Sequence, residues 1–307
     1  MATATKPFDN RDGTIWFDGK LVPWRDAHVH VLTHALHYAS CVFEGERIYG
    51  GRIFKLREHS QRLIDSATIL GFTIPWTLEQ IEEASNATVR ASGILDGYVR
   101  PLAWRGPEQM GVSAQLTKIH LAIAVWDDWK AYFTPEARSK GIRMVWSKWA
   151  RPAPNTAPTA AKAAGLYMIC TLSKHAAEAE GFDDALMLDW RGQIAEATGA
   201  NVFLAIEGEL HTPKPDCFLD GITRRAVIGL ARARQLKVVE RAIMPAELRR
   251  AQEVFVTGTA AEVTPVTQIG EHKFPVGAIS KMLMADFDKL VREPEKTEKP
   301  KTKASAA

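Results

Sequence analysis

The sequence is poor in cysteine and contains no long apolar run. Its three cysteines, Cys41, Cys170 and Cys217, are odd in number and form no Cys-x-x-Cys pair. Such a set argues against a disulfide framework and favours a reducing cytoplasm. No apolar stretch approaches the roughly 18 residues of a transmembrane helix, and the polar segment from Met1 to Arg11 lacks the apolar centre of a signal peptide. We therefore expect a cytoplasmic protein that does not enter the membrane.

The charge balance is equally unremarkable. The net charge is +3 over 307 residues, and four lysines against two glutamates in residues 294–307 supply +2 of it. No basic face remains that would indicate a nucleic-acid partner. With 46% hydrophobic and 24% charged residues, the composition is that of a globular protein with a sizeable core.

Four of the nine histidines cluster near the N-terminus, at His28, His30, His34 and His37. Such a cluster could ligate a metal, but no cysteine or glutamate stands where it would complete a ligand set. We expect these histidines to pack and to form hydrogen bonds, and we predict no metal.

Turn residues and hydrophobic periodicity predict two domains of mixed α and β structure. Hairpins are expected over 14–22, turning at Asp-Gly, and over 43–54, turning at Gly-Gly. Periodic apolar residues predict helices over 59–69 and 78–92, and short apolar runs predict strands over 98–104 and 120–126. These elements form a small N-terminal domain, residues 1–126.

A polar segment, residues 127–138, predicts an interdomain loop. Strands and helices then alternate through a larger C-terminal domain, residues 139–293, and the polar tail 294–307 is expected to be disordered. The strands and helices of this domain are expected over 142–147, 164–180, 184–189, 200–206, 221–234, 254–257 and 279–291, with turns at Arg191-Gly192 and Glu207-Gly208.

Lys162 lies in a run of small residues, Ala160-Ala161 before it and Ala163-Ala164-Gly165 after it. Small neighbours leave room for a bulky group at the amine, and burial would lower the pKa of that amine because it disfavours the ammonium form. A neutral amine of this kind can bind an aldehyde cofactor such as pyridoxal phosphate. The segment alone fits an exposed lysine of a helix or loop equally well. Motifs elsewhere in the chain are needed to distinguish a cofactor-binding lysine from an exposed one.

Several separated motifs accompany Lys162 in one order. Those before it are His34-Ala35-Leu36-His37-Tyr38, Val42-Phe43-Glu44-Gly45 and Gly97-Tyr98-Val99-Arg100-Pro101. Those after it are Gln193-Ile194-Ala195-Glu196-Ala197-Thr198-Gly199-Ala200-Asn201, Leu219-Asp220-Gly221-Ile222-Thr223-Arg224 and Thr257-Gly258-Thr259-Ala260-Ala261-Glu262. Together, over about residues 12 to 292, the chain resembles the class IV aminotransferases that use pyridoxal phosphate, most of all the branched-chain amino acid aminotransferases.

The resemblance implies an α+β (mixed α/β) fold of two domains, the D-amino acid aminotransferase-like fold, with the cofactor between the domains. Lys162 would hold pyridoxal 5'-phosphate and transfer the proton, and Glu196 would pair with the pyridine nitrogen. The other cofactor-binding residues that the resemblance implies are Arg62, Tyr167, Leu219, Ile222, Thr223 and Thr259.

Several of these residues also have a plainer interpretation, and Glu196 could be an ordinary solvated acid at a strand end. Gly221-Ile222-Thr223 opens a periodic apolar segment, and free N–H groups at a helix start bind anions, but the same residues could simply cap a helix. Arg62 could lie on a solvated helix face, and Tyr167 could be a half-buried core tyrosine.

The substrate side is expected on one strand. Tyr98 and Arg100 alternate with Val99 and therefore share a strand face. By resemblance, Arg100 pairs with the distal carboxylate of glutamate, while Tyr98 and the amides near Thr259 hold the α-carboxylate. The other substrate-binding residues that it implies are Ala260 and Ala261 and the apolar or aromatic walls Tyr38, Phe43, Met110, Val112, Trp129 and Tyr132, with Tyr38 and Val112 reaching in from a second subunit.

The function that follows is reversible transfer of the amino group of L-leucine, L-isoleucine or L-valine to 2-oxoglutarate. The alternatives are a D-amino acid or (R)-amine transaminase, an aminodeoxychorismate lyase, or a non-catalytic cofactor-binding protein or scaffold. The expected partners are small amino and oxo acids and a second copy of the chain, with a homodimer as the minimal active unit and a hexamer as a further possibility. The Cys217-Phe218-Leu219-Asp220 loop is heavier than the family's usual loop, which leaves the preferred side chain open.

Overall fold

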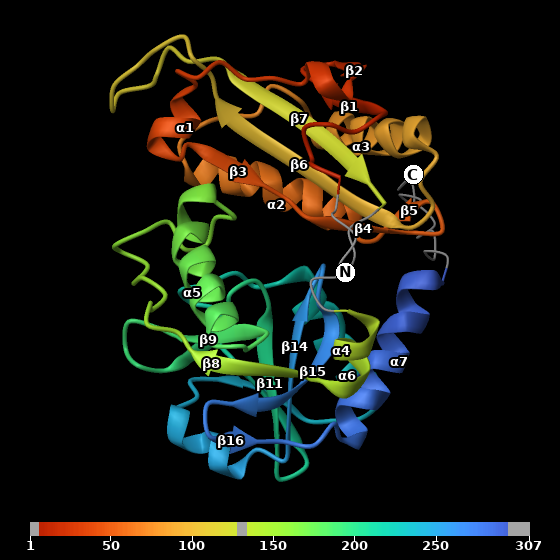
Figure 1. Cartoon of the computed structure of the whole chain (residues 1–307), viewed down its shortest axis with the longest axis vertical. Helices are drawn as coiled ribbons and strands as arrows, with labels where there is room; N and C mark the ends of the chain where they lie inside the picture. The colour runs from red at the N-terminus through yellow and green to blue at the C-terminus, as the bar shows by residue number, and fades with distance from the viewer. Residues whose placement is uncertain (1–5, 128–133, 294–307) are drawn as a thin grey trace, which may run out of the picture.

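The computed structural model describes residues 6–127 and 134–293, which build two β-sheets, each with its own helices. The first sheet lies in the upper half of Figure 1 and holds the N-terminal strands, coloured red to yellow. The second lies in the lower half and holds the strands coloured green to blue. The mixture of helices and strands agrees with the predicted fold class.

The first sheet has seven strands in the order β2-β1-β7-β6-β4-β5, with β3 also paired to β6. Its longest pair is antiparallel, with Pro101 opposite Ile123 near its middle. The Asp18-Gly19 and Gly50-Gly51 turns have positive φ angles, as tight hairpins require. The strand bounds are β1 Thr14–Phe17, β2 Lys20–Pro23, β3 Cys41–Phe43, β4 Glu46–Tyr49, β5 Arg52–Ile53, β6 Gly97–Arg105 and β7 Ile119–Trp126.

Two helices cover this sheet, α2 (Leu56–Ile69) and α3 (Leu78–Ser92). Thr77 begins α3 with a capping box: its hydroxyl accepts from the amide of Gln80, whose side chain accepts from the amide of Thr77. Leu63 of α2 is fully buried in the core between these helices and the sheet. Two short elements, η1 (Trp24–Asp26) and α1 (His34–Tyr38), lie at the edge of this half.

The second sheet runs β10-β9-β8-β15-β14-β11-β12-β13, and the additional pairing of β10 with β11 closes six of its strands into a barrel. Strands β8 and β9 are parallel, whereas β14 pairs antiparallel with both neighbours. The strand bounds are β8 Ile142–Trp146, β9 Asp184–Leu188, β10 Ile194–Ala197, β11 Asn201–Ile206, β12 Glu209–Pro213, β13 Val238–Arg241, β14 Glu253–Gly258, β15 Glu262–Ile269 and β16 His272–Lys273.

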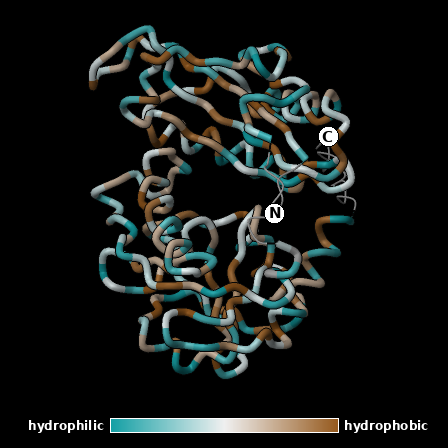
Figure 2. Tube along the Cα trace, in the orientation of Figure 1, coloured by the Kyte–Doolittle hydropathy of each residue, from teal (hydrophilic) through white to brown (hydrophobic). Residues whose placement is uncertain are grey.

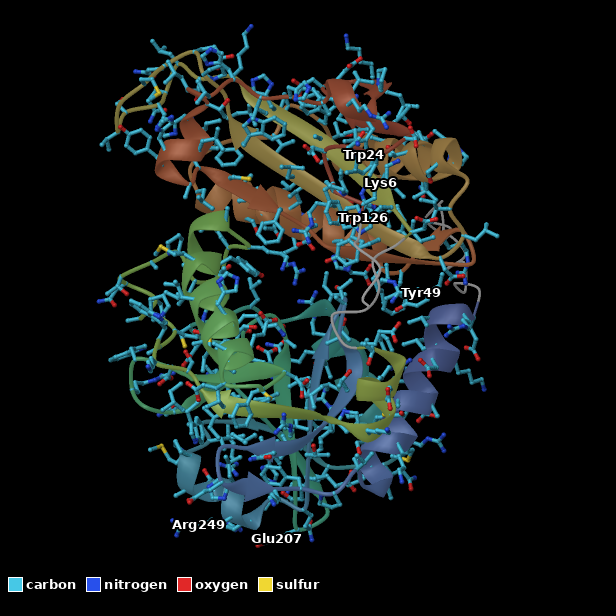
Figure 3. The ribbon with its side chains drawn as sticks, viewed as in Figure 1. Lys6, Trp24, Tyr49, Trp126, Glu207 and Arg249 are labelled. Carbon is cyan, nitrogen blue, oxygen red and sulfur yellow. The ribbon has the colours of Figure 1, made fainter. Side chains whose placement is uncertain are left out.

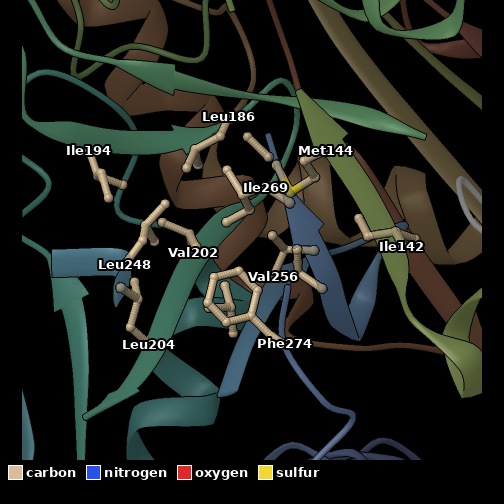
Figure 4. Close-up of a cluster of buried hydrophobic side chains, with 14 of the residues drawn as sticks. Ile142, Met144, Leu186, Ile194, Val202, Leu204, Leu248, Val256, Ile269 and Phe274 are labelled. Atoms are coloured by element: carbon tan, nitrogen blue, oxygen red, sulfur yellow. The ribbon is translucent and has the colours of Figure 1, made fainter. Parts of the chain in front are cut away.

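Strand β11 shows why this barrel has two cores. Its side chains alternate, so that Val202 and Leu204 join the cluster inside the barrel (Figure 4) while Phe203 packs outside against Phe255. The outer cluster is covered by α6 (Ile222–Ala233) and α7 (Ala278–Arg292). Both faces are therefore buried, which explains a continuous apolar strand, seen as brown along the lower strands in Figure 2.

The remaining helices of this half are α4 (Pro135–Lys140), the turn η2 (Ala164–Tyr167), α5 (Met168–Ala179) and η3 (Pro245–Arg250). Two of them differ from the sequence prediction. The segment 164–180 begins as a 3₁₀ turn before α5, and the segment 127–138, expected to be a loop, ends in α4, where Lys140 pairs with Glu136 one turn earlier.

Glu262 connects the two sheets. It lies at the start of β15, accepts a hydrogen bond of 2.6 Å from Tyr49 Oη, and pairs with Arg47 of β4 at 3.1 Å. Its second oxygen is 2.9 Å from Arg138 of α4. Arg47 and Glu262 are buried, so this ion pair is poorly screened and holds the halves in one orientation. Within the described ranges, no helix is long and apolar enough to cross a bilayer.

Glu46 on β4 is a buried acidic residue that lowers the stability of the folded chain. It is fully buried, and neither carboxylate oxygen has a hydrogen-bond partner among the described residues. Burial, with a contribution from Glu44, raises the pKa of Glu46 well above 4.5. Above pH 4.5 the unfolded chain releases this proton while the folded chain retains it, so the free energy of unfolding falls as the pH rises toward the folded-state pKa.

Replacing Glu46 by methionine is therefore expected to raise the free energy of unfolding by about 1–3 kcal/mol at about pH 8, and by less at about pH 5. Urea denaturation at both pH values measures the change. Glu271→Met, at an exposed turn, is the matched control and should change little. An equal gain at the two pH values would contradict the assignment of a buried, protonated carboxyl.

Candidate active site

A cavity of about 670 Å³ opens between the two halves of the molecule. Phe43, Tyr98 and Arg100 line it from the first sheet, and Lys162 and Thr259 line it from the second half. A narrower cavity continues from it toward the start of α6, and both share Lys162 and Tyr167. Residues from motifs far apart in the sequence therefore line one cleft.

Two hydrogen bonds hold the backbone of Lys162 in place. Its amide donates to Ser66 Oγ at 3.0 Å, and its carbonyl accepts from the amide of Phe43 at 3.1 Å. Ala161 and Ala163 on either side are buried. The small residues noted in the sequence thus let the segment 161–163 fit closely between β3 and α2.

The amine of Lys162 points at Tyr167, with Nζ 2.7 Å from the phenol oxygen. Burial, and after it the nearby Arg62 guanidinium, lowers the pKa of Lys162 to about 8. A far larger fraction of this amine than of an ordinary lysine is then neutral near physiological pH, and attack on an aldehyde requires the neutral form. Burial, then Glu196, raises the pKa of Tyr167, so its phenol remains protonated.

Arg62 is held in place by Glu44. Its Nε and Nη2 atoms donate to the two oxygens of Glu44 at 2.6 and 2.8 Å, and His59 Nδ1 is 2.7 Å from the same carboxylate. Burial opposes ionisation of Glu44, but Arg62 and His59 outweigh it and hold the pKa of that carboxyl well below its usual range. A guanidinium held by two hydrogen bonds thus lines the narrower cavity as a fixed positive charge.

Glu196 approaches the same cavity from β10. Its oxygens lie 3.4 Å from Arg151 Nε and 3.3 Å from Asn201 Nδ2, and Asn201 is its direct partner on β11. Burial raises the pKa of Glu196 to about 7, although Arg151 and Lys162 act in the opposite direction. This carboxyl can therefore hold or share a proton at neutral pH.

The far end of the narrower cavity is built to bind an anion. Gly221 is the N-cap of α6, and Thr223 stands in its first turn, where amide donors have no partner within the helix. Gly221 must remain glycine because an added Cβ would lie 2.2 Å from Asn201 Oδ1. Thr257 Oγ1, buried and without a hydrogen-bond partner among the described residues, also lines this end.

These groups fit pyridoxal phosphate. Helix amides, threonine hydroxyls and Arg62 suit its phosphate; Tyr167 suits its phenolate oxygen; Glu196 suits its pyridine nitrogen; and the amine of Lys162 suits its aldehyde. The orphaned hydroxyl of Thr257 is the observation that most calls for a polar ligand, because buried polar groups are normally paired. Leu219 and Ile222 also line the cavity and offer apolar contact to the ring.

The outer cavity is aromatic and cationic. Arg100 Nη2 donates to Tyr98 Oη at 3.4 Å, and the Arg100 guanidinium lies 4.8 Å from the centre of the Phe43 ring. Arg100 Nε is buried without a hydrogen-bond partner in the described part of the chain. Gly45 makes this arrangement possible, since a Cβ there would lie 1.9 Å from Tyr98 Oη. The predicted shared strand face of Tyr98 and Arg100 is confirmed.

Only some of the other predicted substrate-binding residues line this outer cavity. Tyr38 and Val112, with 44% and 87% of their surfaces exposed, do not line the cavity of their own chain, and neither does Met110. Ala260 and Ala261 do line it, beside Thr259. Trp129 and Tyr132 fall outside the described residues. His34, from the histidine cluster, hydrogen-bonds Ser40 and the carbonyl of Gly111.

Four polar residues of the site were missed by the sequence analysis: Glu44, Arg151, Asn201 and Thr257. Glu44, Asn201 and Thr257 stand inside the quoted motifs, so position alone could have singled them out. Arg151 lies in no motif, and only the structure places it beside Glu196.

Comparisons with known proteins agree with this geometry. The family model described as amino-transferase class IV matches residues 41–269. A branched-chain-amino-acid aminotransferase of Pseudomonas aeruginosa is 42% identical over 287 residues, covering 91% of this chain and 93% of its own length.

Two solved structures are similar throughout. The branched-chain amino acid aminotransferase of Escherichia coli has a TM-score of 0.89 and 38% identity, covering 94% of this chain and 98% of its own. The branched-chain amino acid aminotransferase of Thermobaculum terrenum, solved in its pyridoxal phosphate form, has a TM-score of 0.84 and 29% identity, covering 92% and 95%. The predicted fold class is confirmed by these matches.

Proposed function

The chain belongs to the class IV aminotransferase family, a pyridoxal-phosphate-dependent family, and from this premise we propose that it transfers the amino group of L-leucine, L-isoleucine or L-valine to 2-oxoglutarate. The products are branched-chain 2-oxo acids and L-glutamate, and the reaction is reversible. The observation that carries the proposal is the amine of Lys162, 2.7 Å from Tyr167, in a cleft whose outer wall holds Arg100. The names of the similar enzymes support the branched-chain substrate class.

The residues of the inner cavity divide the chemical work. When bound, pyridoxal phosphate supplies an electron-withdrawing ring that stabilises negative charge at the substrate's α-carbon. Lys162 Nζ would take the proton from that carbon and give it to the cofactor's former aldehyde carbon, C4′, two bonds away, which is general acid–base catalysis at short range. Glu196 keeps a proton on the pyridine nitrogen, and Tyr167 orients the Lys162 amine through their hydrogen bond.

Arg62, Thr223 and Thr259 hold the phosphate, and Leu219 and Ile222 hold the ring by contact. Arg62 serves best as a fixed charge because Glu44 binds two of its nitrogens and prevents it from swinging away.

The outer cavity must accept two kinds of side chain. Arg100 pairs with the distal carboxylate of glutamate, while Phe43 and the aromatic ring of Tyr98 contact the aliphatic side chains. Tyr98 and the amides of Ala260 and Ala261 hold the α-carboxylate. Trp129 and Tyr132 complete the apolar wall in this proposal.

The minimal active unit in this proposal is a homodimer. Tyr38, Met110 and Val112 stand on the surface, and the same two stretches of chain expose further apolar side chains, Val29, Val31, Leu32, Leu36 and Leu116. Tyr38 and Val112 then reach the cavity of the partner chain. The proposed domains remain 1–126 and 139–293, joined by 127–138, in a reducing compartment suited to three free cysteines.

One assay tests the proposal. Purified protein is offered a panel of L- and D-amino acids, each with 2-oxoglutarate, and glutamate formation is measured. Turnover should be confined to L-leucine, L-isoleucine, L-valine and close relatives. Consumption of D-amino acids or (R)-amines would favour the stereochemical alternative, and pyruvate release from aminodeoxychorismate without an acceptor would favour the lyase.

A further inference from the structure

The segment before β1, residues 6–13, packs against the first sheet and contributes to the outer cavity. Phe8 packs edge-on against Trp126 of β7, with ring centres 5.3 Å apart, and its carbonyl accepts a hydrogen bond from Trp24 Nε1. Lys6, Trp24 and Trp126 are labelled in the upper half of Figure 3. Phe8 is therefore held by its ring against β7 and by its carbonyl against η1.

Arg11, in the same segment, is buried against Phe8. Only 8% of its surface is exposed, its guanidinium lies 3.9 Å from the centre of the Phe8 ring, and Nη2 donates to the carbonyl of Lys6 at 3.2 Å. Stacking on Phe8 restricts the guanidinium to one plane, which limits the entropy that it would lose on binding a ligand.

Phe8 and Arg11 line the same outer cavity as Tyr98 and Arg100. Two guanidinium groups from separate segments thus face one space. Lys174 adds positive charge to its lining, and no aspartate or glutamate belongs to the lining among the described residues. A cavity with this charge favours an anionic ligand beyond what one arginine would require.

We propose that Arg11 is a specificity-determining residue that, together with Arg100, recognises the distal carboxylate of dicarboxylic substrates. The proposal rests on the function proposed above. The acceptor 2-oxoglutarate and the product glutamate carry a second carboxylate that the branched-chain substrates lack. A carboxylate has two oxygens and can bind two guanidinium groups at once. Phe8 and Trp126, in the same wall, present apolar surface to an aliphatic side chain when that carboxylate is absent.

The test compares dicarboxylic with aliphatic ligands in the holoenzyme. Arg11→Met is expected to raise KM for 2-oxoglutarate roughly 10- to 100-fold, because a charge-assisted hydrogen bond is lost, with kcat nearly unchanged. KM for 4-methyl-2-oxopentanoate, assayed in the reverse direction with glutamate held saturating, should change less than about twofold. Arg11→Lys keeps the charge and should recover part of the loss.

Calorimetry supplies a readout that does not depend on turnover. Glutarate and 4-methylpentanoate carry no amino or oxo group and are therefore not transaminated. Glutarate has a carboxylate at its distal end, where 4-methylpentanoate has an isopropyl group. Arg11→Met should weaken glutarate binding by the same factor as KM and leave 4-methylpentanoate binding unchanged. If the wild type turned over no branched-chain donor but this difference persisted, the proposed function would fail and the role of Arg11 would stand.

Arg25→Met is the matched control. Arg25 bonds Asn10 and Asp12 of the same segment but is exposed and lines no part of the cavity. Its loss should loosen the segment without removing positive charge from the cavity, and both acceptors should keep their KM values. Equal weakening of glutarate and 4-methylpentanoate by Arg11→Met, or no weakening of either, would overturn the proposal.

Discussion

Replacement of Lys162 by alanine is expected to lower kcat roughly 10⁴-fold or more, because one amine both binds the cofactor covalently and transfers the proton. The structure gives physical reasons for choosing this lysine: its amine is 2.7 Å from the Tyr167 hydroxyl, and burial lowers its pKa to about 8. Single-turnover release of 2-oxo acid from L-leucine measures the loss. In the wild type, borohydride reduction followed by peptide mapping should place the cofactor on the peptide that contains Lys162.

Lys237→Ala serves as the control for this replacement. Lys237 is an exposed lysine paired with Glu209 on the far side of the barrel, and its loss should leave both turnover and labelling unchanged. A Lys162→Ala protein that retains wild-type turnover, or a label found on another lysine, would remove the basis of the proposed mechanism.

The parts of the site that the sequence predicted are those set by local geometry. Alternation along a strand places Tyr98 and Arg100 on one face whatever surrounds them, and the structure has them in contact. A helix start at Gly221 requires only the local sequence. The small residues around Lys162 indicated a crowded site, and Ala161 and Ala163 are indeed buried.

The parts that could not be predicted depend on pairs of residues distant in sequence. Arg62 follows Glu44 by 18 residues, and the bidentate pair forms only because α2 packs against β3. Arg47 and Glu262 are 215 residues apart. No periodicity reports such contacts, since periodicity identifies which face of an element is buried but not what covers it. The cavity wall formed by Phe8 and Arg11 escaped notice because the segment before the first strand has no apolar period.

Glu196→Gln is expected to lower kcat roughly 10²- to 10³-fold, the usual effect of removing one electrostatic stabiliser of a transition state. Glutamine has the shape of glutamate and can still bond Asn201, so the fold and the position of the side chain should survive. It carries no negative charge, however, and a neutral partner cannot keep a proton on the pyridine nitrogen. The loss should therefore fall mainly on kcat. The affinity for pyridoxal phosphate, which Arg62 and the start of α6 chiefly provide, should fall by a smaller factor and only above about pH 7, where Glu196 of the wild type is ionised.

Stopped-flow absorbance of the holoenzyme mixed with L-leucine measures the rate of proton removal, and equilibrium dialysis measures the retained cofactor. Glu209→Gln, at a half-buried strand end that lines neither cavity of the site, is the control and should leave both unchanged. The pH profile adds a second criterion. Burial raises the pKa of Glu196 to about 7 before the cofactor binds, so cofactor association in the wild type should strengthen as the pH rises through about 7 and this carboxyl ionises. The glutamine variant should lack that dependence, and a variant that retained both the rate and the pH profile would show that Glu196 does not act on the ring nitrogen.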